Sequence, residues 1–135
     1  MQGAAVPTPD PDLGRQREVV NAFFAAARRG DFDALIAVLD PDVVLRSDGG
    51  ERRRQMTLVQ RGAAEVARNA LAGGALSAAT LRPALVNGAA GVVVIVGRQP
   101  FAVMAFTVAR GKIAEINVVM DPDRLARLDL AVLEE

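Results

Sequence analysis

The chain of 135 residues contains no histidine, cysteine, tyrosine or tryptophan. Without cysteine it has no disulfides, no thiolate nucleophile and no zinc site built on sulfur. Without histidine it lacks the side chain that most often transfers protons in enzymes near neutral pH. These absences exclude most of the side-chain machinery of catalysis, but they still allow an enzyme that uses a single carboxylate as its base.

An excess of charge and long apolar runs are also absent. Sixteen basic and sixteen acidic residues cancel, so we expect no direct contact with nucleic acid. Apolar runs such as residues 92–96 are far too short to cross a bilayer. The N-terminus is rich in proline and aspartate, unlike a secretory signal. We therefore expect no membrane association and a cytoplasmic location.

The first half of the chain is predicted to be mainly helical. Residues 1–14, with three alternating prolines, are expected to form an extended linker, and residues 15–135 a single domain. Apolar periodicity predicts helices over residues 15–30, 31–39 and 62–71. Asp40-Pro41 is predicted to end the second helix, and residues 42–46 read as a strand.

The second half changes to strand periodicity. Four β-rich runs separated by turn residues predict an antiparallel meander, and they cover residues 81–86, 91–96, 101–109 and 113–119. Asp121 is suited to capping a last short helix with Leu125, Leu128 and Val132 on its apolar face. The predicted fold is α+β: a curved, mostly antiparallel sheet packed against three N-terminal helices, forming a cone with a pocket between sheet and helices.

Two short motifs follow the first and the last predicted strands. They are Asp48-Gly49-Gly50 and Asp121-Pro122-Asp123-Arg124-Leu125. Taken alone, the first is typical of a turn and the second of a helix N-cap.

A family resemblance gives both motifs a second interpretation. Residues 19–50, VVNAFFAAARRGDFDALIAVLDPDVVLRSDGG, resemble the opening of the SnoaL-like domain (nuclear-transport-factor-2-like superfamily) at the C-terminus of certain extracytoplasmic-function sigma factors. That family carries a DGGG-type turn and an NPDKL-type motif at the two positions. Here Glu51 follows the glycines, and Asp121 and Arg124 replace the usual Asn and Lys. Nothing in the chain resembles sigma regions two and four.

The resemblance implies a regulatory domain that modulates transcription initiation by a sigma-70-family factor. The implied partners are sigma regions two and four and their linker, contacted through the eight residues of the two motifs. A small apolar ligand in the cone is implied as a modulator, and no cofactor is expected. Because the open face of such a sheet commonly pairs, we expect a homodimer when the chain is isolated.

The pocket of the predicted cone has candidate lining residues. They are Phe23, Phe24, Phe101, Met104, Phe106 and Asn117. Apolar side chains at such spacing are also typical of an ordinary core, so both interpretations stay open.

An alternative function is a cyclase or isomerase in which Asp48 or Glu115 acts as the base. The chain offers no tyrosine as an oxyanion donor, and the sequence contains no convergent set of acid, base and donor. Carboxylate pairs such as Asp40 and Asp42 lack the ligand density of a metal site. On balance, the sequence disfavours an enzymatic function for this chain. A carboxylate enclosed in the pocket with a raised pKa would favour catalysis, and an apolar lining would favour binding.

Overall fold

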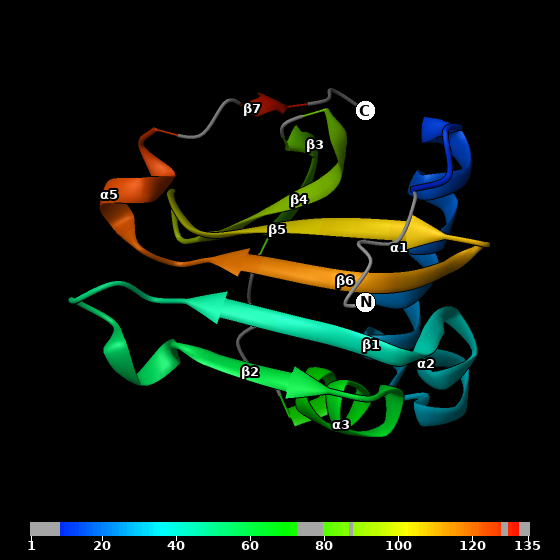
Figure 1. Cartoon of the computed structure of the whole chain (residues 1–135). Coiled ribbons are helices and arrows are strands. Elements are labelled where there is room, and N and C mark those ends of the chain that lie inside the picture. The colour runs from blue at the N-terminus through cyan, green and yellow to red at the C-terminus, as the bar shows by residue number, and fades with distance from the viewer. Residues whose placement is uncertain (1–8, 73–79, 87, 128–129, 133–135) are drawn as a thin grey trace, which may run out of the picture.

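The computed structural model describes residues 9–72, 80–86, 88–127 and 130–132 (Figure 1). The elements in chain order are α1 (Leu13–Arg29), α2 (Phe32–Val38), β1 (Leu39–Asp48), the 3-10 helix η1 (Arg54–Met56), β2 (Leu58–Arg61), α3 (Ala63–Ala72), β3 (Thr80–Val86), β4 (Ala89–Val96), β5 (Gln99–Ala109), β6 (Lys112–Val119), α5 (Pro122–Leu125) and β7 (Leu130–Val132).

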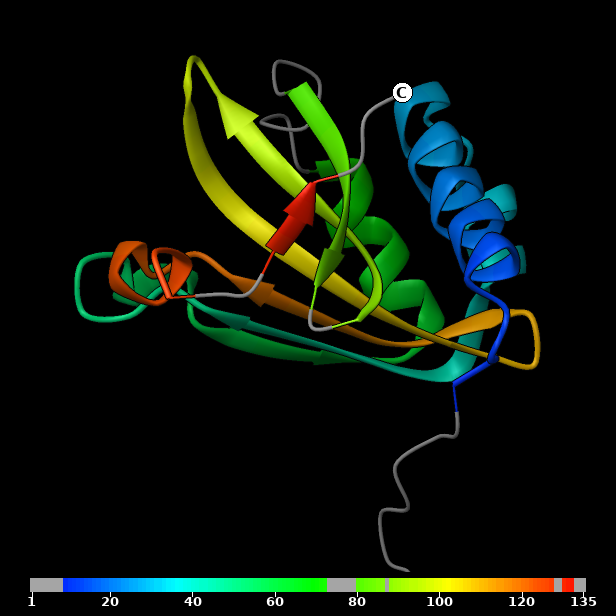
Figure 2. The ribbon, with the colours of Figure 1, turned by 90° about the horizontal axis from the view of Figure 1, so that it is seen from above.

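The strands form one seven-stranded sheet in the order β2-β1-β6-β5-β4-β3-β7. The predicted meander is confirmed, because β3, β4, β5 and β6 pair antiparallel in sequence order. β1 joins β6 in parallel, which makes the sheet mixed. The sheet is strongly bent, and α1 and α3 lie on its concave side (Figure 2). The predicted α+β cone is therefore confirmed.

Local signals account for the ends of the first two helices. Asp12 caps α1 by accepting hydrogen bonds from the N–H groups of Gly14 and Arg15, so this helix begins two residues before the predicted start. Gly30 ends it in the left-handed conformation at φ 69°. Asp31 then caps α2.

The sequence-based prediction was wrong about three segments. Asp40-Pro41 does not separate helix from strand, because β1 begins at Leu39 directly after α2. The four-residue strand β2 was not predicted. The last helix ends at Leu125, and Val132 belongs to β7, which pairs with β3. Leu128, predicted on the apolar face of that helix, lies outside the described residues.

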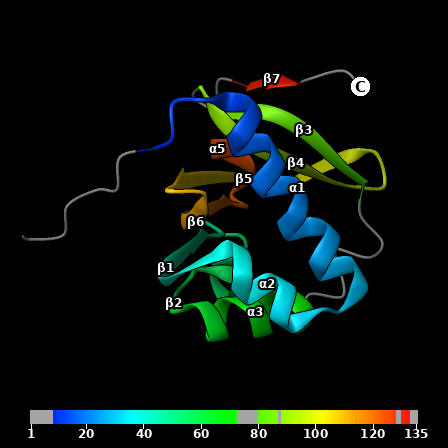
Figure 3. The ribbon, with the colours of Figure 1, turned by 90° about the vertical axis from the view of Figure 1, so that its right-hand side faces the viewer.

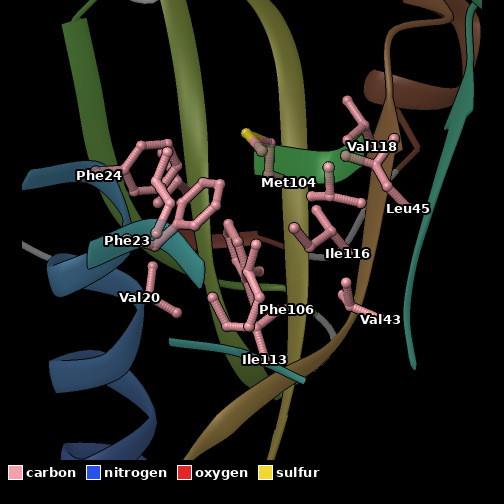
Figure 4. Close-up of a cluster of buried hydrophobic side chains, with 14 of the residues drawn as sticks. Val20, Phe23, Phe24, Val43, Leu45, Met104, Phe106, Ile113, Ile116 and Val118 are labelled. Carbon is pink, nitrogen blue, oxygen red and sulfur yellow. The ribbon is translucent and has the colours of Figure 1, made fainter. Parts of the chain in front are cut away.

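The main core fills the concave side of the sheet. Phe23 and Phe24 of α1 and Phe106 of β5 meet edge to face, with ring centroids between 5.2 and 5.8 Å apart (Figure 4). A second, smaller cluster lies on the opposite face of the sheet. It comprises Ala84, Val86, Val93 and Val103, with Leu125 packed against it. The meander is thus buried on both faces where α5 approaches it.

The last residues of the predicted linker are attached to the domain. The Asp10 carboxylate accepts hydrogen bonds from the N–H groups of Arg110 and Gly111, and its own N–H donates to Val108. Gln16 of α1 is buried, donates to the Asp10 carbonyl and accepts from the Ala90 N–H. Figure 3 shows α1 running across the sheet from this point.

Candidate functional site

The two sequence motifs meet at one end of the sheet, although 76 positions separate Asp48 from Arg124. The Asp48 carboxylate pairs with the Arg124 guanidinium and also accepts a hydrogen bond of 2.9 Å from the Gly50 N–H. Met120, just before the second motif, donates its N–H to the Asp48 carbonyl. The contacts join the end of β1 to the chain that enters α5 (Figure 1). We call the joined motifs the motif junction.

Both glycines of the first motif lie against neighbouring residues with no room for a side chain. Gly50 has φ 65°, and a Cβ there would lie 2.5 Å from the Asp121 Cγ. A Cβ on Gly49 would overlap the backbone carbonyl of Arg53. Gly50 is therefore required for its positive φ, and glycine is required at both positions because a Cβ at either one would collide with a neighbouring residue.

The pKa of Asp48 is lowered from its ordinary value. The largest cause is the hydrogen bond from the Gly50 N–H, followed by the hydrogen bond from Arg124, and the Arg124 charge adds to them. Desolvation acts in the opposite direction and is outweighed. A carboxylate with a lowered pKa stays ionised at neutral pH and is a weak general base.

Arg53 holds the segment after the first motif against the sheet. Its guanidinium donates to the carbonyls of Phe101 and Met120, both at 2.9 Å. It also lies over the Phe101 ring, 4.5 Å from the centroid. These contacts position η1, which carries Gln55 and Met56 to the rim of a cavity.

The cavity lies between the concave face of the sheet and the helices and measures about 370 Å³. Its wall is mainly apolar. It is lined by Phe23, Leu45, Ser47, Gln55, Met56, Leu58, Val66, Asn69, Ala70, Val94, Phe101, Ala102, Met104, Val118 and Met120. The structure thus places Phe23, Phe101 and Met104 at this wall, while Phe24 and Phe106 lie in the core and are not among its lining residues.

A second concavity of about 450 Å³ lies on the opposite face of the sheet, beside the motif junction. Arg46, Asp48 and Arg124 line it together with small apolar residues. Asn117 lines it too and not the apolar cavity where the sequence had placed it, because Asn117 alternates along β6 with the inward Ile116.

The second carboxylate candidate also faces away from the helices. Glu115 pairs with Arg46 across neighbouring strands at 3.3 Å. Neither Glu115 nor Asp48 is among the residues that line the apolar cavity. Within the described residues no group of three acidic side chains could hold a metal ion, and no helix is long and apolar enough to cross a membrane.

The sequence alone did not single out two residues of this region. Arg53 was not a candidate residue, and only the fold brings the carbonyls of Phe101 and Met120 beside it. Ser47 was given no role either, although it continues the alternation of Val43 and Leu45 along β1. That alternation was the signal that could have identified it.

Comparison with known proteins finds sequence relatives of this chain. No family model matches the chain. Over 111 residues it is 33% identical to the probable ECF RNA polymerase sigma factor SigI of Mycobacterium tuberculosis. The matched region covers 82% of this chain and 37% of that protein. The chain is homologous to extracytoplasmic-function sigma factors. It spans little more than a third of the length of this relative.

Solved structures agree with this relationship. The extracytoplasmic-function sigma factor SigJ of Mycobacterium tuberculosis matches with a TM-score of 0.65 and 29% identity, over 86% of this chain and 44% of that one. An NTF2-like protein from Burkholderia xenovorans LB400 has a TM-score of 0.55 and 24% identity, over 87% and 98% of the two chains. The latter match shows the fold alone. The predicted NTF2-like fold and the resemblance to these sigma factors are confirmed.

Proposed function

We propose that this chain is a regulatory domain of an extracytoplasmic-function sigma factor and modulates transcription initiation by docking on sigma regions two and four and their linker. The observation that carries the proposal is the motif junction in a chain homologous to such factors. Two motifs distant in sequence form one surface, which suits a single contact with a partner domain.

The chemistry of the motif junction supports a docking role. The side chains of Asp48 and Arg124 remain 44% and 53% exposed although they pair with each other. Asp123 is exposed beside them, whereas Leu125 packs against the second cluster. The charged groups are therefore held in fixed positions yet open to a partner, and fixed polar groups favour specific docking.

The apolar cavity supplies a route for regulation of that docking. Ser47 and Asp48 are neighbours on β1, and alternation directs their side chains to opposite faces of the sheet. A ligand against Ser47 would contact the strand that carries Asp48, so its binding could shift the geometry of the motif junction. Ligand occupancy would then adjust how strongly the domain docks.

The alternative of a cyclase or isomerase is less well supported. Its candidate bases, Asp48 and Glu115, lie outside the apolar cavity, and each is paired with an arginine. The pKa of Asp48 is lowered, which is the opposite of what a general base near neutral pH requires.

The test compares transcription by a sigma factor that carries this domain with transcription by the same factor lacking it. We expect removal of the domain and Asp48→Ala each to change promoter output about five-fold or more. The control is Arg29→Ala, which removes an exposed ion pair with Asp31 far from both motifs and should leave output unchanged. Equal output from all four forms would refute the proposal.

A further inference from the structure

Ser47 is a buried polar side chain whose hydroxyl no described residue satisfies. It is only 7% exposed, and its Oγ has no hydrogen-bond partner among the residues that the structure describes. Buried hydroxyl groups almost always have a partner, because an unpaired one costs free energy of folding. An unpaired hydroxyl at a cavity wall therefore points to a ligand that completes its hydrogen bonding.

The strand directs this hydroxyl into the apolar cavity. Buried residues alternate along β1, with Val43, Leu45 and Ser47 on the helix side and Arg46 on the other side. Leu45 lines the cavity, and Ser47 lines it one pleat further along the same face. Ser47 of β1 is also among the residues that line the second concavity.

The rest of the wall defines what could sit there. None of the described residues that line the cavity carries a charge, so an ionic ligand would lose its hydration without compensation. Phe23, Met104 and Val118 offer apolar surface. Besides Ser47, the polar lining residues are Gln55 and Asn69, which are themselves exposed and therefore mark the opening.

We propose that the apolar cavity binds an uncharged, largely apolar small molecule whose carbonyl or hydroxyl oxygen hydrogen-bonds to Ser47 Oγ. A serine hydroxyl both donates and accepts, so either oxygen type completes its hydrogen bonding. The volume of about 370 Å³ suits a molecule of two or three fused rings or a comparable chain. The regulatory effect of such a ligand rests on the function proposed above, whereas its binding does not.

The test uses three probes of similar shape that differ in one group. Acetonaphthone is an uncharged ketone, ethylnaphthalene lacks the oxygen, and naphthoate is charged. Their affinities for the isolated chain are measured by displacement of the fluorescent naphthyl ketone prodan. We expect wild type to prefer acetonaphthone over ethylnaphthalene by roughly three- to ten-fold, the effect of one hydrogen bond, and to bind naphthoate weakly.

Substitutions at Ser47 then assign the preference to its hydroxyl. Ser47→Ala should abolish the preference for the ketone while leaving the affinity for ethylnaphthalene and the thermal stability of the empty chain unchanged or higher, because no existing hydrogen bond is lost. Ser47→Thr should retain the preference. The matched control Thr107→Ala removes a hydroxyl from β5 that does not line the cavity.

The position of the site is tested by Ala70→Phe, which fills the cavity and should weaken binding of both uncharged probes. The proposal is overturned if no probe binds, if naphthoate binds as tightly as the ketone, or if Ser47→Ala keeps the ketone preference. These measurements contain no polymerase, so they can succeed even if the domain proves to have no effect on transcription.

Discussion

At the scale of single residues, Asp48 shows how one side chain can hold two motifs together. Its carboxylate accepts hydrogen bonds from the Gly50 N–H of its own turn and from the Arg124 guanidinium of α5. The sequence predicted that Asp48 would bond backbone in a turn, and it does. It could not predict Arg124 as the partner, because the pairing depends on β1 and β6 lying side by side.

The lowered pKa of Asp48 makes the stability of the domain depend on pH. The folded state favours the ionised carboxylate, so this stabilisation is fully present above the unfolded-state pKa of about 3.9 and is lost as pH falls through the lower folded-state value. We expect the melting temperature of wild type to exceed that of Asp48→Asn by a few degrees at neutral pH, because the pair is exposed. The difference should vanish in acid.

The control for this prediction is Arg124→Met. It removes the arginine but leaves the Gly50 hydrogen bond, so the folded-state pKa of Asp48 is lowered less, and the loss of stabilisation should be smaller and complete at a higher pH than in wild type. A melting temperature difference that persists unchanged down to the most acidic pH would contradict the assignment to Asp48.

At the scale of elements, the turn after β1 and the start of α5 pack so closely that glycine is required. Sequence reasoning recognised the turn and the helix cap separately, since both depend on local chemistry. It missed β2 and β7, which have four and three residues and exist because neighbouring strands offer them hydrogen-bonding partners. Short edge strands carry too little periodicity to be read alone.

Substitution of Gly50 by alanine should destabilise the protein by more than backbone strain alone. Gly97 has a similar positive φ of 68° with nothing within 4 Å of a new Cβ, so Gly97→Ala should cost about 1–2 kcal/mol. Gly50→Ala adds the collision with Asp121 and should cost roughly 1–3 kcal/mol more. Urea unfolding of the two variants checks the difference, and equal costs would show that Asp121 moves aside freely.

At the scale of the whole molecule, the bent sheet separates two environments. Its concave side holds the main core and the apolar cavity, and the opposite side carries the motif junction and exposed charge. Val59 of β2 is 56% exposed and lies opposite Arg46, whose side chain faces away from the helices. This part of the sheet offers a surface on which a second copy could pack.

We expect the isolated chain to be a homodimer that uses this open face. Light scattering should give twice the mass of one chain, and Val59→Asp should shift it to the monomer because a charge would be buried in the interface. Val96→Asp is the matched control, since Val96 is an exposed strand valine on β4, remote from β2 in the sheet. A monomeric mass for the wild-type chain would refute the prediction.

The sequence by itself determined the order of helices and meander strands, the Asp121 cap of the last helix and the absence of the common catalytic side chains. These features depend on periodicity, local hydrogen bonding and composition, which are properties of neighbouring residues. Tertiary structure alone decided that Asp48 meets Arg124, that Asn117 faces away from the apolar cavity and that no described residue pairs with the Ser47 hydroxyl. Each of these depends on how a sheet bends and which strands become neighbours, and the free energy that fixes that arrangement is spread over contacts between distant parts of the chain.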